Sequence, residues 1–549
     1  MRLAPIPARA GLAGLAAGAL LLASCAESDR NDAGGGETGG TFVFAGSAEP
    51  VTLDPFFASD GESFRVARQM FEGLVGTEPG TADPAPLLAT DWQVDEDTGL
   101  SYTFNLRDDV TFSDGTAFDA EAVCANFDRW YEMPKSAQTD DLTYYYGALF
   151  RGFKTGPRSG DAIYDSCSAD DEFTATVNLK EPFAGFISAL SLPAFSMQSP
   201  TALEKFQDDA ATNPKNTEYS TAEPTGTGPF VLDTWARGQN VTLARNPDYW
   251  GDPALVDQAV VVAIEDPRAR ADALRNGEID GFDLVGPADI APLESDGFQI
   301  VDRDPFNVLY LGMNQKQSPL GDIEVRKAIA HALNIPEIIS ASMPEGTEPA
   351  IEFVPPSVMG YTEDVPTYEY DPEMARQMLA DAGAAGATIE FNYPTGVSRP
   401  YMPQPEDTFN VIRAQLEAVG LKIRPTADQW SPDYLEKIQG TKKHGLHLLG
   451  WTGDYNDTDN FLGVFFGSPS NEWGFDNPEI FSALREARGL PTPEEQEPLY
   501  EDINAQVMEF LPGVPLANPV PSLAFAPGVE GYQQSPVQDE VWNAVSVGD

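Results

Sequence analysis

The sequence predicts an α/β protein with two or three lobes, and three observations support this prediction. The chain has 549 residues, which is more than one hydrophobic core usually holds. Hydrophobic residues make up 42% of the chain and aromatic residues 10%, enough to fill several cores. Apolar residues at helical spacing alternate along the chain with strand-like stretches, which is typical of α/β lobes.

The N-terminus predicts export from the cytoplasm. Arg2 and Arg9 precede an apolar run over residues 10–23 that is too short to cross a membrane. The run ends in Leu-Ala-Ser-Cys at residues 22–25, which resembles the bacterial lipoprotein box. We therefore expect a signal peptide over residues 1–24 and a lipid on Cys25, with an ordinary signal peptide as the alternative.

A charged, glycine-rich stretch follows Cys25 up to residue 40 and has too little apolar surface to fold, so a flexible tether is expected there. The other two cysteines, Cys124 and Cys167, would face an oxidising compartment, where pairing is the default and two buried free thiols are the alternative. The formal net charge of −53 repels nucleic acids and anionic membranes, which argues against a DNA- or RNA-binding protein.

The first part of the folded chain alternates between strands and a helix. Strand-like alternation covers residues 41–45 and 101–107, and residues 110–115 predict a strand that closes in a tight Asp-Gly turn. Between them, a helix should carry Val66, Met70, Phe71 and Leu74 on one face and end at Gly76.

The later part continues the alternation. Strands are expected over residues 308–314, 421–423 and 443–450, and helices should begin at capping residues or first-turn prolines. The residues expected to open these helices are Asp322, Asn334 with Pro336, Asp371 and Asp407.

The most informative stretch is residues 448–457, where an apolar strand ends in Gly450, Trp451, Thr452, Gly453 and Asp454. The glycines allow close backbone approach, and Asp454 would emerge at the carboxyl edge of a strand, where α/β sheets hold ligands. The alternative is a turn whose aspartate caps the next helix.

Several short strings occur in a fixed order along the chain. They are FEGLV at 71–75, LLATDW at 87–92, YTFNLR at 102–107, FSDGT at 112–116, GTGPF at 226–230, RNPDYWG at 245–251 and NGEIDG at 276–281. In this order and spacing they resemble the peptide-binding lipoproteins of ABC importers, the family 5 solute-binding proteins that bind oligopeptides, dipeptides and nickel. The resemblance runs from residue 41 to the C-terminus and is closest to the dipeptide binders.

The resemblance implies a type II periplasmic-binding-protein fold, with two lobes around a ligand cleft. Lobe I would have its core in residues 41–67, 196–305 and 517–549 and an extra subdomain in 68–195, while residues 306–516 would form the ligand-binding lobe II. Residues 510–516 resemble the family's return crossing between lobes. The sequence departs from the family at Asn334-Ile335-Pro336-Glu337, where relatives usually have an Asp-Arg pair.

The resemblance also assigns ligand-binding residues. Asp454 matches the aspartate that pairs with a dipeptide's α-ammonium, and Ser398-Arg399-Pro400-Tyr401 resembles the Arg-Pro-Tyr whose arginine holds the α-carboxylate. By the same analogy Phe57, Ser59 and Asp60 should face the ligand from lobe I.

The chemistry of a zwitterion supports the Asp454 and Arg399 assignments independently. A zwitterion enclosed between lobes needs a partner for each charged end, and arginine can bind a carboxylate through two parallel hydrogen bonds. A surface ion pair is the alternative for Arg399. An extended dipeptide would need roughly 12 Å between the Asp454 carboxylate and the Arg399 guanidinium, and a separation beyond about 18 Å would contradict the dipeptide assignment.

Catalytic and metal sites are not expected. The sequence has no Gly-x-Ser-x-Gly elbow, His-Glu-x-x-His motif or phosphate loop, which disfavours a secreted hydrolase. His444 and His447 should lie on opposite faces of a strand, which disfavours a metal site. No cofactor is expected.

The function predicted is that of an anchored, monomeric, extracytoplasmic binding protein. It would deliver short peptides, with dipeptides expected, to an ABC permease. An oligopeptide, oligosaccharide, nickel chelate or haem is the alternative ligand.

Overall fold

The computed structural model describes residues 39–548, except 96, 140, 208–212 and 442. The expected signal peptide, Cys25 and the tether up to residue 38 lie outside this part of the chain. The described residues alternate between helices and strands in mixed sheets, which confirms the α/β prediction.

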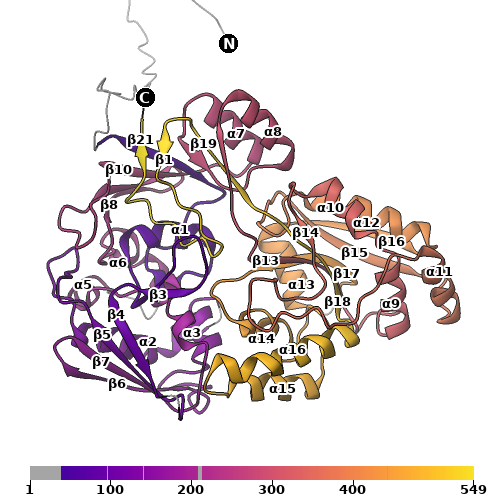
Figure 1. The fold of residues 1–549 in the computed structure, drawn as a ribbon, viewed down its shortest axis with the longest axis horizontal. Coiled ribbons are helices and arrows are strands. Elements are labelled where there is room, and N and C mark those ends of the chain that lie inside the picture. The colour runs from indigo at the N-terminus through magenta and orange to yellow at the C-terminus, as the bar shows by residue number, and fades with distance from the viewer. Residues whose placement is uncertain (1–38, 96, 140, 208–212, 442, 549) are drawn as a thin grey trace, which may run out of the picture. The chain divides into compact units, whose positions relative to one another are not determined.

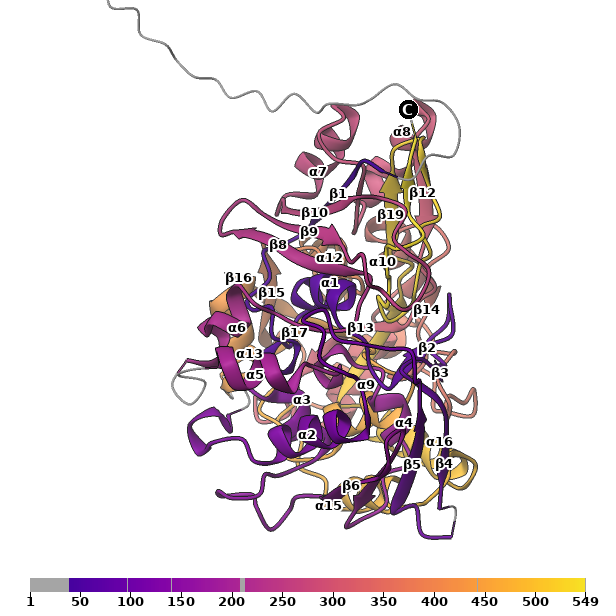
Figure 2. The same cartoon turned by 90° about the vertical axis from the view of Figure 1, so that its left-hand side faces the viewer.

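The first sheet has the strand order β12-β19-β11-β1-β10-β9-β8 and joins distant parts of the sequence. Strand β1 pairs in parallel with β10 on one side and β11 on the other. Strands β8, β9 and β10 form an antiparallel run (Figure 2). Its strands are β1 (Thr41–Gly46), β8 (Phe230–Ala236), β9 (Asn240–Arg245), β10 (Gln258–Ala263), β11 (Gly281–Phe282), β12 (Gln299–Asp302) and β19 (Ser522–Phe525). The helices of this region are α1 (Gly61–Met70), α5 (Pro200–Phe206), α6 (Glu218–Thr221), α7 (Pro267–Arg275) and α8 (Pro287–Asp296).

The second sheet is antiparallel, with the order β4-β5-β7-β6, and a short hairpin of β2 and β3 precedes it. One face of β5 and β7 is buried at alternate residues, as expected for a sheet with a single core face. The elements are β2 (Val75–Thr77), β3 (Pro84–Pro86), β4 (Ala89–Val94), β5 (Ser101–Leu106), β6 (Tyr164–Asp171), β7 (Thr174–Leu179), α2 (Ala120–Tyr131), α3 (Tyr144–Leu149) and α4 (Phe186–Ala189).

The third sheet has the order β14-β18-β13-β17-β15-β16. Strand β13 is buried along its whole length, and helices α9 and α11 pack together, as do α10 and α12 (Figure 1). Its strands are β13 (Asn307–Met313), β14 (Glu348–Pro349), β15 (Thr388–Thr395), β16 (Lys422–Gln429), β17 (Leu446–Thr452) and β18 (Gly513–Asn518). The helices are α9 (Ile323–His331), α10 (Ile335–Ser342), α11 (Pro372–Asp381), α12 (Pro405–Ala418), α13 (Leu435–Gly440), α14 (Leu462–Phe466), α15 (Pro478–Arg488) and α16 (Pro493–Phe510).

The chain crosses between the first and third sheets in two adjacent segments. The Asn307 side chain donates to the Pro519 carbonyl at 3.0 Å, and the Asn518 side chain donates to the Asn307 carbonyl at 2.7 Å. Next to them, buried Arg303 pairs with Asp283 and Glu540. The crossings are therefore fixed side by side, as expected for connections that link two lobes.

Most expected helix starts are confirmed. The Asp322, Asn334 and Asp371 side chains accept hydrogen bonds from the first turns of α9, α10 and α11. Helix α12 begins at Pro405, so Asp407 lies in its first turn rather than at its cap. Residues 112–116 form the expected tight turn, in which Gly115 has φ +83°.

The prediction that the helix after the first strand ends at Gly76 is wrong. Helix α1 ends at Met70, and Phe71 is extended with φ −126° and ψ 145°. The chain passes so close to its neighbours here that a Cβ on Gly73 would lie 2.7 Å from the Val75 carbonyl oxygen and 2.9 Å from that of Leu190. Tertiary packing therefore overrides the helical spacing of Phe71 and Leu74.

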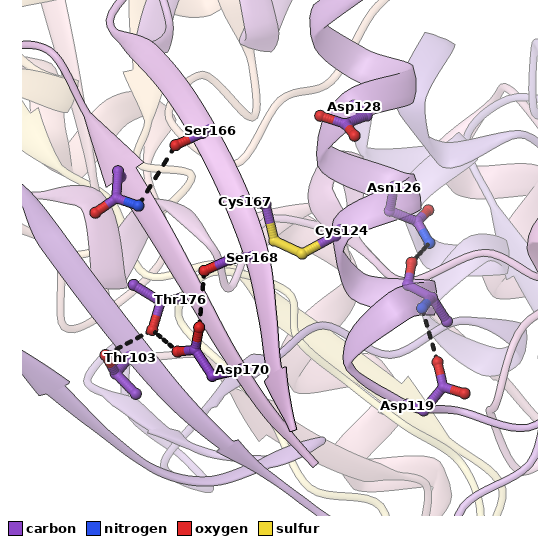
Figure 3. The surroundings of a disulfide bond; sticks show 12 residues. Thr103, Asp119, Cys124, Asn126, Asp128, Ser166, Cys167, Ser168, Asp170 and Thr176 are labelled. Atoms are coloured by element: carbon purple, nitrogen blue, oxygen red, sulfur yellow. Dashed lines mark hydrogen bonds between the residues drawn. A yellow bond between two sulfur atoms is a disulfide. The ribbon is translucent and has the colours of Figure 1, made fainter. Parts of the chain in front are cut away.

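Cys124 on α2 and Cys167 on β6 form a disulfide, with a Cα–Cα distance of 5.2 Å (Figure 3). This agrees with the expected pairing. The bond joins the helix to the edge of the second sheet across 43 residues of sequence.

Replacing both cysteines by serine is expected to lower the free energy of unfolding by about 2–4 kcal/mol, because the unfolded chain gains the freedom that the loop closure removes. Thermal melting of the double variant and of the wild type with and without reductant would measure this. An unchanged melting temperature in all three samples would contradict it.

Glu352 is a buried acid of the third-sheet region, with 1% of its surface exposed. The Thr362 backbone N–H donates to Oε1, Oε2 has no hydrogen-bond partner in the described part of the chain, and burial raises the pKa of Glu352 to about 9. Because this folded-state pKa lies above the unfolded value of 4.5, stability is lost as the pH rises from about 4.5 to 9.

A Glu352→Gln variant should therefore be more stable than the wild type at pH 7, by up to about 3 kcal/mol, and equally stable at pH 4. Urea unfolding at both pH values would measure the difference, with exposed Glu363→Gln as the control. A destabilised Glu352→Gln protein at pH 7 would show that the carboxylate is ionised and paired.

Candidate functional site

The predicted site lies at one edge of the third sheet. Strands β15 and β17 are parallel neighbours, with Asn392 opposite His447. Arg399 follows Asn392 by seven residues and Asp454 follows His447 by seven, so both emerge beyond the carboxyl ends of adjacent strands. This edge is where open α/β sheets hold ligands.

Asp454 is half-buried and incompletely paired. Its backbone N–H donates to Asn460 Oδ1 at 2.9 Å, whereas its Oδ2 is shielded from solvent and has no hydrogen-bond partner among the described residues. Burial raises the pKa of Asp454 to about 6, and bonds from Tyr145 and Asn460 and the charge of Arg68 oppose that rise. A carboxylate in this state gains most from a cationic partner.

The residues just before Asp454 shape the strand end. A Cβ on Gly450 would lie 2.3 Å from the Tyr401 ring, and one on Gly453 would lie 2.2 Å from the Phe306 ring. The close approach expected at these glycines is therefore made by the protein's own aromatic rings. The Trp451 indole donates to Asn460 at 3.3 Å, and Thr452 Oγ1 is buried without a partner in the described part of the chain.

Arg399 lies in a tight turn, in which its backbone and that of Met402 exchange hydrogen bonds of 3.1 and 2.9 Å. Its guanidinium lies over the Trp430 ring, 4.6 Å from the centroid, and its Nε is buried without a hydrogen-bond partner among the described residues. Tyr401, two residues on, is 8% exposed, and burial raises its pKa to about 12. The stacked guanidinium is held in place by the indole yet leaves donors free for an anion.

A pocket of about 490 Å³ lies beside this turn. Residues 394–397, which lead directly to Arg399, line it together with residues 404–407 of the third-sheet region and residues 265–267 next to the first sheet. Space for a ligand thus exists where the two predicted lobes face each other.

The three residues expected from lobe I differ in their surroundings. Phe57 is only 1% exposed and packs against Phe56 and the Arg129 guanidinium, as a core residue does. Ser59 is exposed, and Asp60 caps α1 by accepting from the Ser63 backbone at 2.9 Å and its hydroxyl at 2.7 Å. Burial raises the pKa of Asp60, and the Ser63 bonds and the charge of Arg399 oppose the rise.

Three further residues of the site were not predicted. Tyr145 from α3 and Arg68 from α1 lie near the Asp454 carboxylate, and Trp430 stacks on Arg399. Only Trp430 left a signal, a large aromatic directly after β16. Tyr145 and Arg68 are distant in sequence, and only the tertiary fold brings them to Asp454.

The loop after β17 also contacts the second-sheet region. Tyr455 is buried in the aromatic core that contains Phe127 and Phe186, and Asn456 donates to Asp83 at 2.8 Å. Asp457 packs against Gly185, where a Cβ would lie 2.2 Å from its carboxylate. Asp454 thus lies near the start of the loop after β17, which bridges the two predicted lobes.

The prediction that His444 and His447 lie on opposite faces is wrong. Strand β17 begins at Leu446, so His444 precedes it, and the two rings lie 5.1 Å apart, both beside Glu472. Burial lowers the pKa of His444 to about 4. No group of three or more histidine, cysteine, aspartate or glutamate side chains in the described ranges is arranged to hold a metal ion.

The family model of the bacterial extracellular solute-binding proteins, family 5, matches residues 83–473, which is most of the chain. The chain belongs to this family. The resemblance inferred from the sequence strings is thereby confirmed, and the protein is an extracytoplasmic solute-binding protein.

The relatives are named for different ligands. The chain is 29% identical to haem-binding protein A of Haemophilus influenzae, over 97% of the chain and 98% of that protein. It is 28% identical to the dipeptide-binding protein of Escherichia coli, over 92% of the chain and 94% of that protein.

A solved binding-protein structure also matches. The periplasmic binding protein DppA of Helicobacter pylori in complex with the peptide STSA has a TM-score of 0.78 at 27% identity, covering 94% of this chain and 99% of that one. This likeness confirms the type II periplasmic-binding-protein fold. Within the described residues, no helix has the length and apolar character needed to cross a membrane.

Proposed function

We propose that this family 5 protein captures short zwitterionic peptides, above all dipeptides, for an ABC importer. The observation that carries the proposal is the placement of Asp454 and Arg399 beyond adjacent parallel strands, each with a buried polar atom that lacks a partner in the described part of the chain. An anion and a planar cation on one rigid sheet suit the two ends of a peptide.

The structural likeness to DppA with bound STSA and the similarity to dipeptide-binding relatives support a peptide ligand. The DppA ligand is longer than a dipeptide, so peptide length is the finer part of the proposal. A dipeptide requires about 12 Å between the Asp454 carboxylate and the Arg399 guanidinium, and the proposal predicts this separation.

The remaining assignments follow from family membership and the N-terminal sequence. The protein would be held to the outside of the cell membrane by lipid on Cys25, act as a monomer, and pass its ligand to a membrane permease. Catalysis is not part of this function.

Calorimetric titration with Ala-Ala, acetyl-Ala-Ala, a tetrapeptide and haem would test the proposal. We expect Ala-Ala to bind and acetylation to abolish binding, because the acetyl group removes the charge that Asp454 would meet. Tighter binding of haem or the tetrapeptide would overturn the dipeptide assignment, and turnover of any compound would indicate an enzyme.

A further inference from the structure

The Asp454 carboxylate can be reached by a ligand only when groups around it move. Its Oδ2 is shielded from solvent, so a peptide ammonium cannot reach this atom from bulk water in the conformation described. Asp454 belongs to predicted lobe II, and the residues that follow it contact the second-sheet region of predicted lobe I. Contacts between the two lobes must therefore break when a ligand enters or leaves.

The two lobes exchange one side chain each. Tyr455 is 1% exposed and lies in the core of the second-sheet region, with Phe127 and Phe186. In the other direction Ala82, from the turn between β2 and β3, is 8% exposed and lies in the core of the third-sheet region. Each lobe thus buries apolar surface of the other, which stabilises the arrangement in which they touch.

Two close contacts lie beside the exchanged side chains. Asp83 accepts a hydrogen bond of 2.8 Å from the Asn456 side chain. The backbone of Gly185, at the start of α4, lies so close to Asp457 that a Cβ there would be 2.2 Å from Oδ2. Both contacts join protein groups directly, so they can form before a ligand binds.

The loop after β17 is fixed to its own lobe. The Asp457 side chain accepts a hydrogen bond of 2.7 Å from the Asp459 backbone N–H, and Asp459 pairs with Arg488 of α15. Nearer the strand, Asn460 Oδ1 accepts from the Asp454 backbone N–H at 2.9 Å. The loop therefore moves with lobe II, and the position of Asp454 is coupled to the contacts between the lobes.

We propose that these contacts form a latch that holds the two lobes closed over Asp454. The latch consists of Ala82, Asp83 and Gly185 on lobe I and Tyr455, Asn456 and Asp457 on lobe II. This role rests on the proposed function, and it makes the affinity for a peptide depend on contacts that lie outside the ligand-binding residues. Because such an interface is packed as closely as a protein core, one added methyl group should prevent full closure.

Gly185→Ala is the decisive variant. Gly185 lies outside the predicted ligand-binding residues, and its φ of −70° is one that alanine adopts. The added methyl group would lie well inside van der Waals contact with the Asp457 carboxylate on the other lobe. We expect calorimetry to show Ala-Ala binding weakened at least about tenfold. Gly160→Ala is the matched control and should bind like the wild type, since a Cβ on Gly160 would have no atom within 4 Å.

A double variant separates a closure defect from damage within lobe I. A Cβ on Gly185 would also lie 3.0 Å from the Phe183 ring of the same lobe. Asp457→Ala removes the carboxylate on the other lobe and leaves this ring in place. Gly185→Ala combined with Asp457→Ala should therefore bind Ala-Ala at least about threefold more tightly than Gly185→Ala alone. A double variant that binds no better would place the defect within lobe I and overturn the latch.

Small-angle scattering tests the latch without a peptide. Ligand-free Gly185→Ala should have a larger radius of gyration than the wild type and Gly160→Ala, with thermal melting as the check that each variant is folded. Equal radii, or equal affinities of Gly185→Ala and the wild type for Ala-Ala, would overturn the latch and leave the dipeptide function standing. If the folded wild type binds no dipeptide, the proposed function fails, and the radii alone then decide whether the latch exists.

Discussion

Asp454→Ala is expected to weaken Ala-Ala binding at least about 100-fold, because truncating one partner of a buried charge pair costs about 2–5 kcal/mol or more. The fold should be unaffected, since the carboxylate leaves Oδ2 unpaired in the described structure and its desolvation disfavours the charged form. Calorimetry measures the affinity and thermal melting the fold. The control is Asp476→Ala, which removes an exposed carboxylate from the same region.

The same carboxylate should make binding depend on pH. Burial raises the pKa of Asp454 to about 6 in the free protein, so the anion that an ammonium requires is lost below pH 6. Affinity for Ala-Ala should be constant above about pH 7 and fall roughly tenfold per pH unit below 6. The weak binding left in Asp454→Asn should not change over this range, and a pH-dependent Asp454→Asn protein would assign the titration to another group.

Arg399→Ala is expected to weaken Ala-Ala binding to a similar extent, because the peptide carboxylate would be enclosed without its partner. Arg399→Lys should recover only part of this loss, since lysine keeps the charge but not the planar fork or the stacking on Trp430.

C-terminally amidated Ala-Ala provides the matched control for Arg399. It lacks the carboxylate, so the wild type and Arg399→Ala should bind it equally weakly. If the amide lost as much affinity as the free dipeptide on this substitution, Arg399 would support the site's structure and not contact the peptide terminus.

Local pattern predicted much of the fold. Apolar spacing and capping residues located β13, α9, α10 and α11, since their signals agree with their tertiary surroundings. It failed at Phe71, where a backbone crossing near Gly73 forces an extended chain that helical spacing alone cannot reveal. It failed again at His444, because β17 begins at Leu446. His444 therefore lies before the strand, and strand alternation does not set the direction of its ring.

The sequence indicated one half of the site better than the other. Asp454 and Arg399 follow strands of a single sheet, and their motifs are contiguous in the chain. Tyr145 and Arg68 come from distant helices and become neighbours of Asp454 only when the sheets pack. For Phe57 the family analogy predicted a ligand contact, but its surroundings in the fold are those of a core residue.

A crystal structure of the protein with Ala-Ala bound would test the central claim most directly. We expect the peptide ammonium within hydrogen-bond distance of the Asp454 carboxylate, the peptide carboxylate on the Arg399 guanidinium, and about 12 Å between the two groups. Peptide termini that face bulk solvent, or that contact neither side chain, would contradict the account.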